Sequence, residues 1–304
     1  MRTIAISRDT DRVRGGGLIL AGSVVLFASA WPLTKLALVH GTSPLWFALG
    51  RSALSGIMAT AMLAARGGLV LPRRADIASM CSIGGLQLAG YFALAHAALA
   101  WVPAGRTSIL ANTTTMWVVP LSVLILRERV PPRRWLACVL ALAGVAVLAS
   151  PWSIDWRSAP VLIGHGFLLG AGLAWSVSMI ITRAAPPVLT MFELLPWAFA
   201  LSSLLLFALI LIEEPHGSFG ADWASWSALL YVGAVAGPLG TWCVVEATAR
   251  LPIAVSSVGF LATPATTLVL SNLMLHEPIT LDLILGFLLI MAGVGFAAFS
   301  RERR

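Results

Sequence analysis

Residues 124–145, LILRERVPPRRWLACVLALAGV, recur later in the chain as residues 273–294, LMLHEPITLDLILGFLLIMAGV. Each copy begins with Leu-x-Leu-x-Glu, which ends on Glu128 in the first copy and on Glu277 in the second, and each copy closes on Ala-Gly-Val. The two glutamates are 149 positions apart in a chain of 304 residues. This spacing indicates that the chain consists of two related halves.

The same spacing relates residues further upstream. Near the start of each half, Ala30-Trp31 matches Ala174-Trp175 at a slightly shorter spacing, so the loops between the spans differ in length. We therefore expect two units, residues 1–151 and residues 152–304. Other pairs at the spacing of the glutamates are Gly84 and Gly233, Ala98 and Ala247, Ala100 and Ala249, Pro103 and Pro252, and Ser108 and Ser257.

The composition predicts an integral membrane protein. Hydrophobic residues make up 59% of the chain and charged residues only 11%, which is too little charge to solvate a globular protein of this size. The net charge of +7 does not indicate nucleic acid binding, because the arginines occur in short clusters between apolar runs. The first apolar run has no small-residue cleavage site, so we interpret it as a retained helix. Cys81, Cys138 and Cys243 lie inside apolar runs, which predicts buried thiols.

Ten apolar runs, bounded by charged residues, Pro or Gly, predict an all-α membrane protein with ten transmembrane helices. Most runs are near the ~20 residues that a helix needs to cross the hydrocarbon core. The fifth run is the shortest and fits a tilted or peripheral helix. The runs are 16–39, 44–65, 77–100, 104–126, 134–150, 160–182, 188–212, 224–248, 252–275 and 280–299.

The arginines between these runs predict the orientation. If the N-terminus is cytoplasmic, Arg157 is the one arginine of the outer loops. The positive-inside rule then places both termini in the cytoplasm. Because five spans is an odd number, the second half enters the membrane in the opposite sense, and the repeats are inverted. The arginines of the inner side are Arg2, Arg8, Arg12, Arg14, Arg66, Arg73, Arg74, Arg127, Arg129, Arg133, Arg134, Arg183, Arg250, Arg301, Arg303 and Arg304.

Two inverted halves around one cleft can open alternately to the two sides, and this architecture is typical of secondary transporters. The chain has no HExxH, GxSxG or Walker motif, and its histidines are scattered, so we expect no enzyme activity, no cofactor and no metal. A membrane-embedded enzyme acting on lipid-linked substrates is the alternative from another class. The expected partners are a small-molecule substrate and the lipid bilayer, without nucleic acid, and the oligomeric state stays open.

These features resemble the EamA-type exporters of the drug/metabolite transporter superfamily. The resemblance covers nearly the whole chain and rests on the two five-span halves, on fourth spans that end in LRERVPP (126–132) and LHEPIT (275–280), and on fifth spans that close on Ala-Gly-Val. It implies an inner-membrane exporter of small metabolites, above all amino acids, with relatives among the aromatic amino-acid exporters. Another polar metabolite or a hydrophobic cation is the alternative cargo. The membrane glutamate in the first helix of the four-span relatives has no counterpart here.

Three cations lie at or near membrane depth. Lys35, one turn beyond Trp31-Pro32, either reaches the outer headgroups or faces a cleft. Arg51 lies about seven residues into the second span, a depth awkward to snorkel from, so we expect it to face the bundle. Arg106 is near the outer start of the fourth span, where we expect an interface role. Each could hold the carboxylate of an amino acid, because a cation in a water-filled cleft attracts anions.

The third span, GGLQLAGYFALAHAALAW (84–101), carries Gln87 and Tyr91 one turn apart on one face, with His96 further round and nearer the exterior. We expect Tyr91 to line a cavity. The small residues Gly84 and Gly85 predict close packing against neighbouring helices.

Polar runs at matched depth occupy the fourth and ninth spans. The fourth holds Asn112 to Thr115, followed by Trp117 and Pro120, and the ninth holds Thr263, Pro264, Thr266, Thr267, Ser271 and Asn272. A single Ser or Thr more often bonds its own helix, but two matched runs indicate a cavity lining. We expect Pro120 and Pro264 to free carbonyls that point into the cleft.

Four tryptophans lie well inside their spans, away from the interfacial belts: Trp31, Trp117, Trp175 and Trp242. An indole in lipid leaves its N–H unpaired, which favours a cleft-facing position. Glu246, one turn from Trp242, is a candidate proton-sensitive gate, and an ion pair with Arg250 is the alternative. The candidate substrate-binding residues are Trp31, Lys35, Arg51, Gln87, Tyr91, Asn112, Thr114, Trp117, Trp175, Ser178, Trp242, Thr263 and Thr267.

Overall fold

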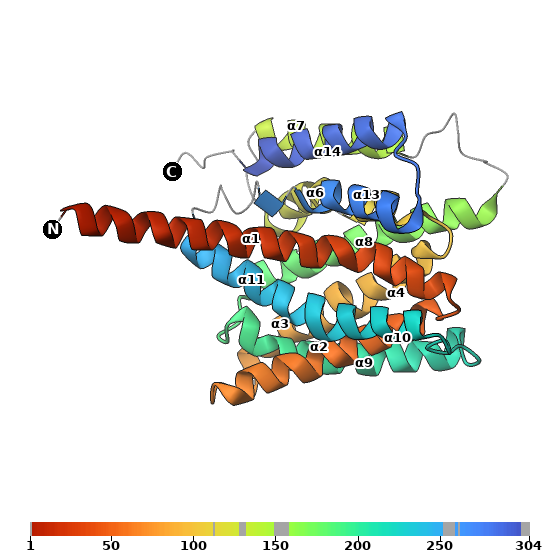
Figure 1. The fold of residues 1–304 in the computed structure, drawn as a ribbon, viewed down its shortest axis with the longest axis horizontal. Coiled ribbons are helices and arrows are strands. Elements are labelled where there is room, and N and C mark those ends of the chain that lie inside the picture. The colour runs from red at the N-terminus through yellow and green to blue at the C-terminus, as the bar shows by residue number, and fades with distance from the viewer. Residues whose placement is uncertain are drawn as a thin grey trace.

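The computed structural model describes residues 2–111, 113–127, 132–148, 158–251, 259–260 and 262–298, and within these ranges it contains helices but no strand. The helices run along one common axis (Figure 1). They are α1 (Arg2–Val39), α2 (Pro44–Ala65), η1 (Arg74–Asp76), α3 (Ile77–Ser82), η2 (Ile83–Gly90), α4 (Tyr91–Leu99), α5 (Ala104–Ala111), α6 (Thr114–Leu126), α7 (Pro132–Leu148), α8 (Ala159–Ala184), α9 (Met191–Glu213), α10 (Trp223–Leu230), η3 (Tyr231–Ala236), α11 (Gly237–Arg250), α13 (Ala262–Leu275) and α14 (Leu281–Ala298).

The apolar runs coincide with these helices wherever the structure describes them. Seven helical stretches are long and apolar enough to cross a membrane, and three shorter apolar helices lie at Cys138–Leu148, Ala262–Leu275 and Leu281–Gly293. The chain is therefore a multi-pass membrane protein. Helix α1 begins at Arg2, earlier than the predicted run, although its membrane-length stretch begins at Gly15. A helix satisfies its own backbone in water as well as in lipid, so an apolar run marks the membrane part and not the helix end.

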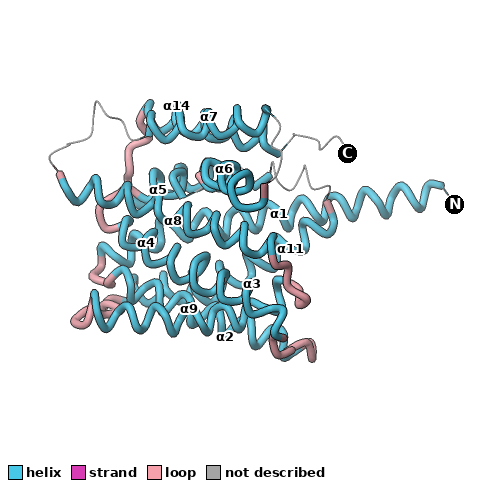
Figure 2. Tube along the Cα trace, turned by 180° about the vertical axis from the view of Figure 1, so that it is seen from behind, coloured by secondary structure: helices cyan, strands magenta, loops and turns pink. Residues whose placement is uncertain are grey.

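The helices pack in layers (Figures 1 and 2). Helices α7 and α14 lie side by side at one edge, where a Cβ at Gly144 would lie 2.6 Å from Cγ1 of Ile290 and 2.9 Å from the carbonyl oxygen of Gly286. Small residues permit such close approach between membrane helices. Helices α1 and α8 lie in the middle of the bundle, and α2 packs along α9 at the opposite edge. The N-terminal end of α1 and the C-terminal end of α14 lie at the same end of the bundle.

The third and eighth spans each contain a π-helical segment, η2 in the first half and η3 in the second. Gly84 of η2 and Gly233 of η3 are a pair at the spacing of the predicted repeat, and each lies against a helix of the other predicted half, α9 for Gly84 and α2 for Gly233. A Cβ at Gly84 would lie 2.8 Å from the carbonyl oxygen of Ala198 in α9, and one at Gly233 would lie 2.8 Å from Cβ of Leu54 in α2. Single-turn π segments are frequent at functional sites.

We expect Gly84→Ala to lower the unfolding temperature in detergent, because its Cβ meets a backbone atom that cannot move aside, and overpacking of this kind costs about 1–3 kcal/mol. The matched control is Gly85→Ala, whose Cβ would lie 3.7 Å from Cδ1 of Leu205, an ordinary contact. Thermal unfolding followed by fluorescence checks both variants. Equal unfolding temperatures for the two variants would contradict the close packing of η2 on α9.

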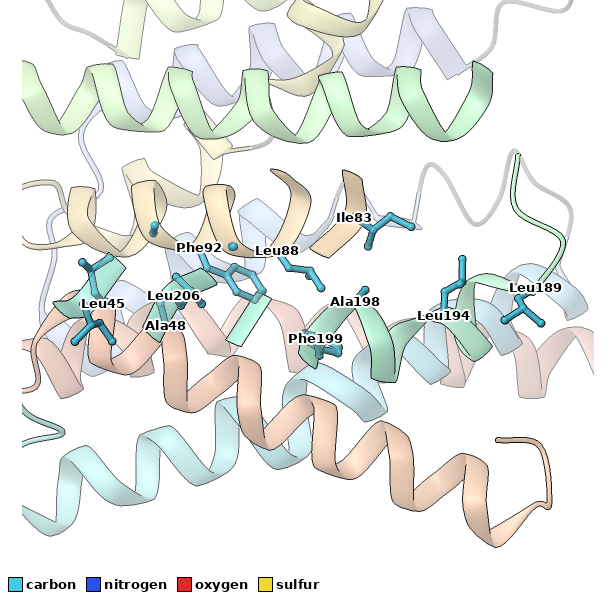
Figure 3. Packing of buried hydrophobic residues seen from close by; sticks show 13 residues of the cluster. Leu45, Ala48, Ile83, Leu88, Phe92, Leu189, Leu194, Ala198, Phe199 and Leu206 are labelled. Carbon is cyan, nitrogen blue, oxygen red and sulfur yellow. The ribbon is translucent and has the colours of Figure 1, made fainter. Parts of the chain in front are cut away.

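The largest apolar cluster joins α2, η2, α4 and α9 (Figure 3). Leu88 and Phe92 pack from η2 and α4 against Ala198 and Phe199 of α9, all less than a tenth exposed. This cluster fixes the third span against the seventh. It thereby positions the polar face of the third span, which is described below.

The expected burial of the thiols is confirmed for Cys138 alone, and the expected orientation of the carbonyl that Pro120 frees is wrong. Cys81 is exposed, while Cys138 is buried and Cys243 is intermediate, because the lipid-facing surface is as apolar as the interior. The carbonyl of Met116, which Pro120 frees, does not point into a cleft, since the Cys138 thiol of α7 donates to it at 3.4 Å.

Candidate functional site

Arg51 extends from α2 into the bundle, as its depth predicts. Its guanidinium carbon lies 4.3 Å from the centre of the Phe92 ring, and its Nη1 lies 3.3 Å from Nε2 of His96. Because a guanidinium only donates hydrogen bonds, Nε2 of His96 accepts and the ring proton is assigned to Nδ1. No carboxylate pairs with Arg51 in the part of the chain that the structure describes. This leaves a cation at membrane depth held by an aromatic face and a neutral imidazole.

Next to Arg51, the third span faces α8. The rings of Tyr91 and Trp175 meet edge to face, with centroids 4.9 Å apart. One turn away, the Ser178 hydroxyl donates to Oε1 of Gln87 at 3.3 Å. The structure therefore brings four predicted site residues together on the two helices. Gln87 and Tyr91 share a face because they are one turn apart.

Trp31 of α1 packs against an apolar cluster that Tyr91 also contacts, and that includes Ala95 and Leu168. The predicted tryptophan of the first span and the tyrosine of the third therefore border the same part of the interior. Ser29 of α1 is 2.9 Å from the Tyr231 hydroxyl of η3, a contact that the sequence analysis did not single out.

The polar run of the fourth span falls at a break between α5 and α6. Asn112 lies outside the described residues; the Thr113 hydroxyl bonds the carbonyl of Leu110. The Ser176 hydroxyl of α8 lies 3.2 Å from the carbonyl of Thr114, which is partly buried. Nε1 of Trp117 is buried without a hydrogen-bond partner among the described residues. The break thus faces α8 and leaves a buried indole N–H free to donate.

The ninth span presents Thr263 and Thr267. The Thr267 hydroxyl donates to its own helix at Thr263 and lies 3.2 Å from the carbonyl of Ala28 in α1, which Pro32 frees. Thr267 therefore joins α13 to α1. The Thr263 hydroxyl is buried and has no partner within the described residues.

Charged residues gather at one end of the bundle, the predicted outer end. The two carboxylate oxygens of Glu277 accept the backbone N–H groups of Ala104 and Gly105, at 2.7 and 3.0 Å, and so cap the start of α5. Arg106 pairs with Asp282 at 2.8 Å, with both side chains less than a fifth exposed. The interface role that we expected for Arg106 stays a prediction, and the pair with Asp282 gives its partner within the bundle.

Lys35 lies at the same end and contacts the end of α4. Its ammonium donates to the carbonyl of Leu99, and the carbonyls of Ala100 and Val102 are 3.5 and 3.4 Å away. A cation at the C-terminal end of a helix is favourable. The Lys35 ammonium is therefore engaged by carbonyls at the end of α4, whereas the sequence analysis expected it to reach the headgroups or to face a cleft. Lys35 thus contacts the start of the loop between α4 and α5, and Glu277 contacts the end of that loop.

Comparison with known proteins fits this arrangement. The sequence model of the EamA-like transporter family matches the chain twice, at residues 14–150 and 162–299. The chain belongs to the EamA-like transporter family. It is thus a membrane transporter of the drug/metabolite transporter superfamily and not an enzyme, as the fourth and fifth spans of each half predicted.

Relatives of this transporter cover most of its length at low identity. The uncharacterized transporter YoaV of Bacillus subtilis is 22% identical over 92% of this chain and 95% of its own. A probable terminal-alkyne amino-acid exporter of Streptantibioticus cattleyicolor is 27% identical over 90% of this chain and 89% of its own. A crystal structure with a TM-score of 0.62 and 21% identity covers 93% of this chain and 96% of its own. That likeness supports the fold.

Three carboxylates of the transporter lie toward the predicted inner end. Glu193 forms a capping box with Thr190 at the start of α9, in which its carboxylate accepts the backbone N–H of Thr190. Asp76 is fully buried, and its Oδ1 accepts the N–H groups of Val188 and Leu189. Glu246 and Trp242 lie one turn apart in α11, both partly buried.

Sequence reasoning missed the part that His96 plays in this transporter. It placed His96 away from the face of Gln87 and Tyr91, but the structure buries His96 to 1% exposure against Arg51. The available signal was a polar residue at membrane depth in the third span and a cation at similar depth in the second. The sequence of the third span alone does not specify which neighbouring helix packs against His96.

Proposed function

We propose that this protein exports small carboxylate metabolites, foremost amino acids, across the plasma membrane. The observation that carries the proposal is Arg51, a cation at membrane depth that no carboxylate of the described residues neutralises. Such a cation attracts an anion from a water-filled cleft, and every amino acid brings a carboxylate. The relative named as a probable amino-acid exporter supports this cargo class.

The proposed cargo site lies between α2, the third span and α8. Arg51 binds the carboxylate, while the edge-to-face pair of Tyr91 and Trp175 borders the cargo side chain. Gln87 and Ser178 supply polar groups beside it. Further lining residues in the proposal are Trp31, Thr114, Trp117, Trp242 and Thr263. Lys35 and Thr267 have their donors engaged by carbonyls, so we assign them to helix packing.

A hydrophobic cation is the alternative cargo, and Arg51 argues against it, because two like charges in a low-dielectric interior repel. Another polar metabolite with an anionic group would use the same site. Counterflow in proteoliposomes, with a panel of labelled amino acids, other carboxylates and hydrophobic cations, tests the proposal. Exchange of amino acids supports it. Exchange of the hydrophobic cations, with none of the carboxylates, would overturn it.

We further propose that residues 1–151 and 152–304 are inverted five-helix repeats that work by alternating access. The twofold match of the family model supports this, as do the π segments at equivalent places in the third and eighth spans. The two segments also make equivalent hydrogen bonds, each to the first helix of the other proposed repeat: Gln87 of η2 accepts from Ser178 of α8, and the Tyr231 hydroxyl of η3 bonds with the Ser29 hydroxyl of α1. Helices α1 and α8 also run in opposite directions (Figure 1).

In this scheme the outer end is closed in the described conformation. Glu277 and Asp282 of the second half bond to Ala104, Gly105 and Arg106 of the first half. Opening the outer side separates these halves and breaks the bonds. Glu246 is the proposed proton-sensitive group near the inner end.

Reporter fusions test the orientation, with both termini expected in the cytoplasm. Fusions after residues 14, 70, 130 and 304 should report a cytoplasmic location, because arginines concentrate in those segments. Fusions within 150–159 and 213–223 should report an external location. A single clear reversal among them would contradict the inverted repeats.

A further inference from the structure

We propose that His96 is a positioning residue that presents the Arg51 guanidinium to the cargo carboxylate, and so sets the preference of the transporter for carboxylates over the corresponding amides. The inference rests on the proposed function. It concerns a different residue and is tested separately below.

The first argument is the poor fit of His96 to its surroundings. It is 1% exposed, and its Nδ1 has no hydrogen-bond partner in the part of the chain that the structure describes. A buried donor without a partner destabilises the fold, a penalty that a phenylalanine of similar shape would not incur. Retaining an imidazole here therefore needs a compensating contact. The contact that the structure provides is the one to Arg51.

The second argument is that the imidazole itself is held in place. Its ring stacks on Phe92 at a centroid distance of 5.6 Å and an interplanar angle of 4°, and it meets the Phe47 ring edge-on at 5.6 Å and 79°. Phe47 is fully buried and Phe92 is 6% exposed. A ring packed between two buried aromatics has little freedom, so Nε2 is a fixed acceptor.

The third argument is geometric. Phe92 supports one face of the Arg51 guanidinium, and His96 accepts from Nη1. A planar group held at one face and at one donor has a defined orientation. Arg51 has five N–H donors, and His96 is their one hydrogen-bond acceptor among the described residues. The remaining donors are thus free to form the paired hydrogen bonds that a planar carboxylate accepts.

The test compares His96→Phe, which keeps the shape and loses the acceptor, with His96→Gln, which keeps a neutral acceptor. The matched control is His165→Phe, at a part-buried histidine of α8. Counterflow is measured for an amino acid that the wild type exchanges and for its amide. We expect His96→Phe to raise KM for the acid about tenfold, the worth of one hydrogen bond to a charged group. The maximal rate and KM for the amide should stay unchanged.

We expect His96→Gln to restore most of the affinity for the acid, and His165→Phe to behave as the wild type. If His96→Phe does not fold, His96→Met takes its place as the variant without a strong acceptor. Equal KM increases for acid and amide would overturn the positioning role, as would an unchanged KM for the acid. If Arg51→Gln is selective for the acid while the His96 variants are not, the inference fails and the proposed function stands. If neither residue affects the acid selectively, the proposed function fails.

Discussion

Arg51→Gln should lower the transport of carboxylate cargo about 10- to 100-fold, the worth of a charge-assisted hydrogen bond or a bidentate pair. The reason is that Arg51 is the cation of the proposed site, and glutamine is shorter and carries no charge. The measurement is counterflow of an amino acid and of its amide, since the amide has no anionic group for Arg51 to bind. Transport of the amide and the yield of folded protein should remain near those of the wild type.

Two further variants sharpen this result. Arg51→Lys should recover little of the loss, because an ammonium does not form two parallel bonds to a carboxylate and stacks less well on Phe92. Arg66→Gln is the matched control, since Arg66 is the exposed C-cap residue of the same helix. Equal losses for acid and amide, or a collapse of the folded yield, would assign Arg51 to the scaffold instead.

Glu277→Gln should shift the transporter toward an outward-open state. Both carboxylate oxygens of Glu277 accept backbone N–H groups of α5, at 2.7 and 3.0 Å. A glutamine keeps one acceptor oxygen and turns an NH₂ donor toward the second N–H. Losing a hydrogen bond to a charged group changes the balance between closed and open outer ends by about 10- to 100-fold.

Thiol labelling from the outside measures this shift. A cysteine at Thr107, which is fully buried in α5, is introduced after the three native cysteines are replaced by serine. An impermeant reagent should label it faster in the Glu277→Gln background. The control is Glu213→Gln, the same change at an exposed glutamate that ends α9. Equal labelling rates in the two backgrounds would contradict the closing role of Glu277.

Much of the fold could be predicted because apolar run length is a direct consequence of membrane thickness. The runs 44–65 and 104–126 end at the residues where α2 and α6 end. The break at Thr113 was not predicted, because the same threonines are compatible with a continuous helix whose hydroxyls bond back one turn. The start of α1 was missed because polar residues can extend a helix beyond the membrane.

The site was harder to predict, since its contacts join different helices. The depth of Arg51 indicated that it faces the bundle, and the spacing of Gln87 and Tyr91 placed them on one face. However, the contact of His96 with Arg51 depends on how α2 packs on α4. The carbonyl freed by Pro120 met Cys138 for a similar reason, because α7 packs on α6. In lipid, helix packing depends on how closely the surfaces of two helices fit together, and a single sequence does not specify which two surfaces make contact.

The most direct test of the central claim is counterflow by the wild-type protein with one cargo in two forms. Proteoliposomes loaded with an unlabelled amino acid should accumulate the same labelled amino acid. Liposomes loaded with its amide should accumulate about 10- to 100-fold less of the label at equal concentration, because the amide offers Arg51 no negative charge. Equal accumulation with acid and amide would contradict recognition of the carboxylate by a cation in the bundle.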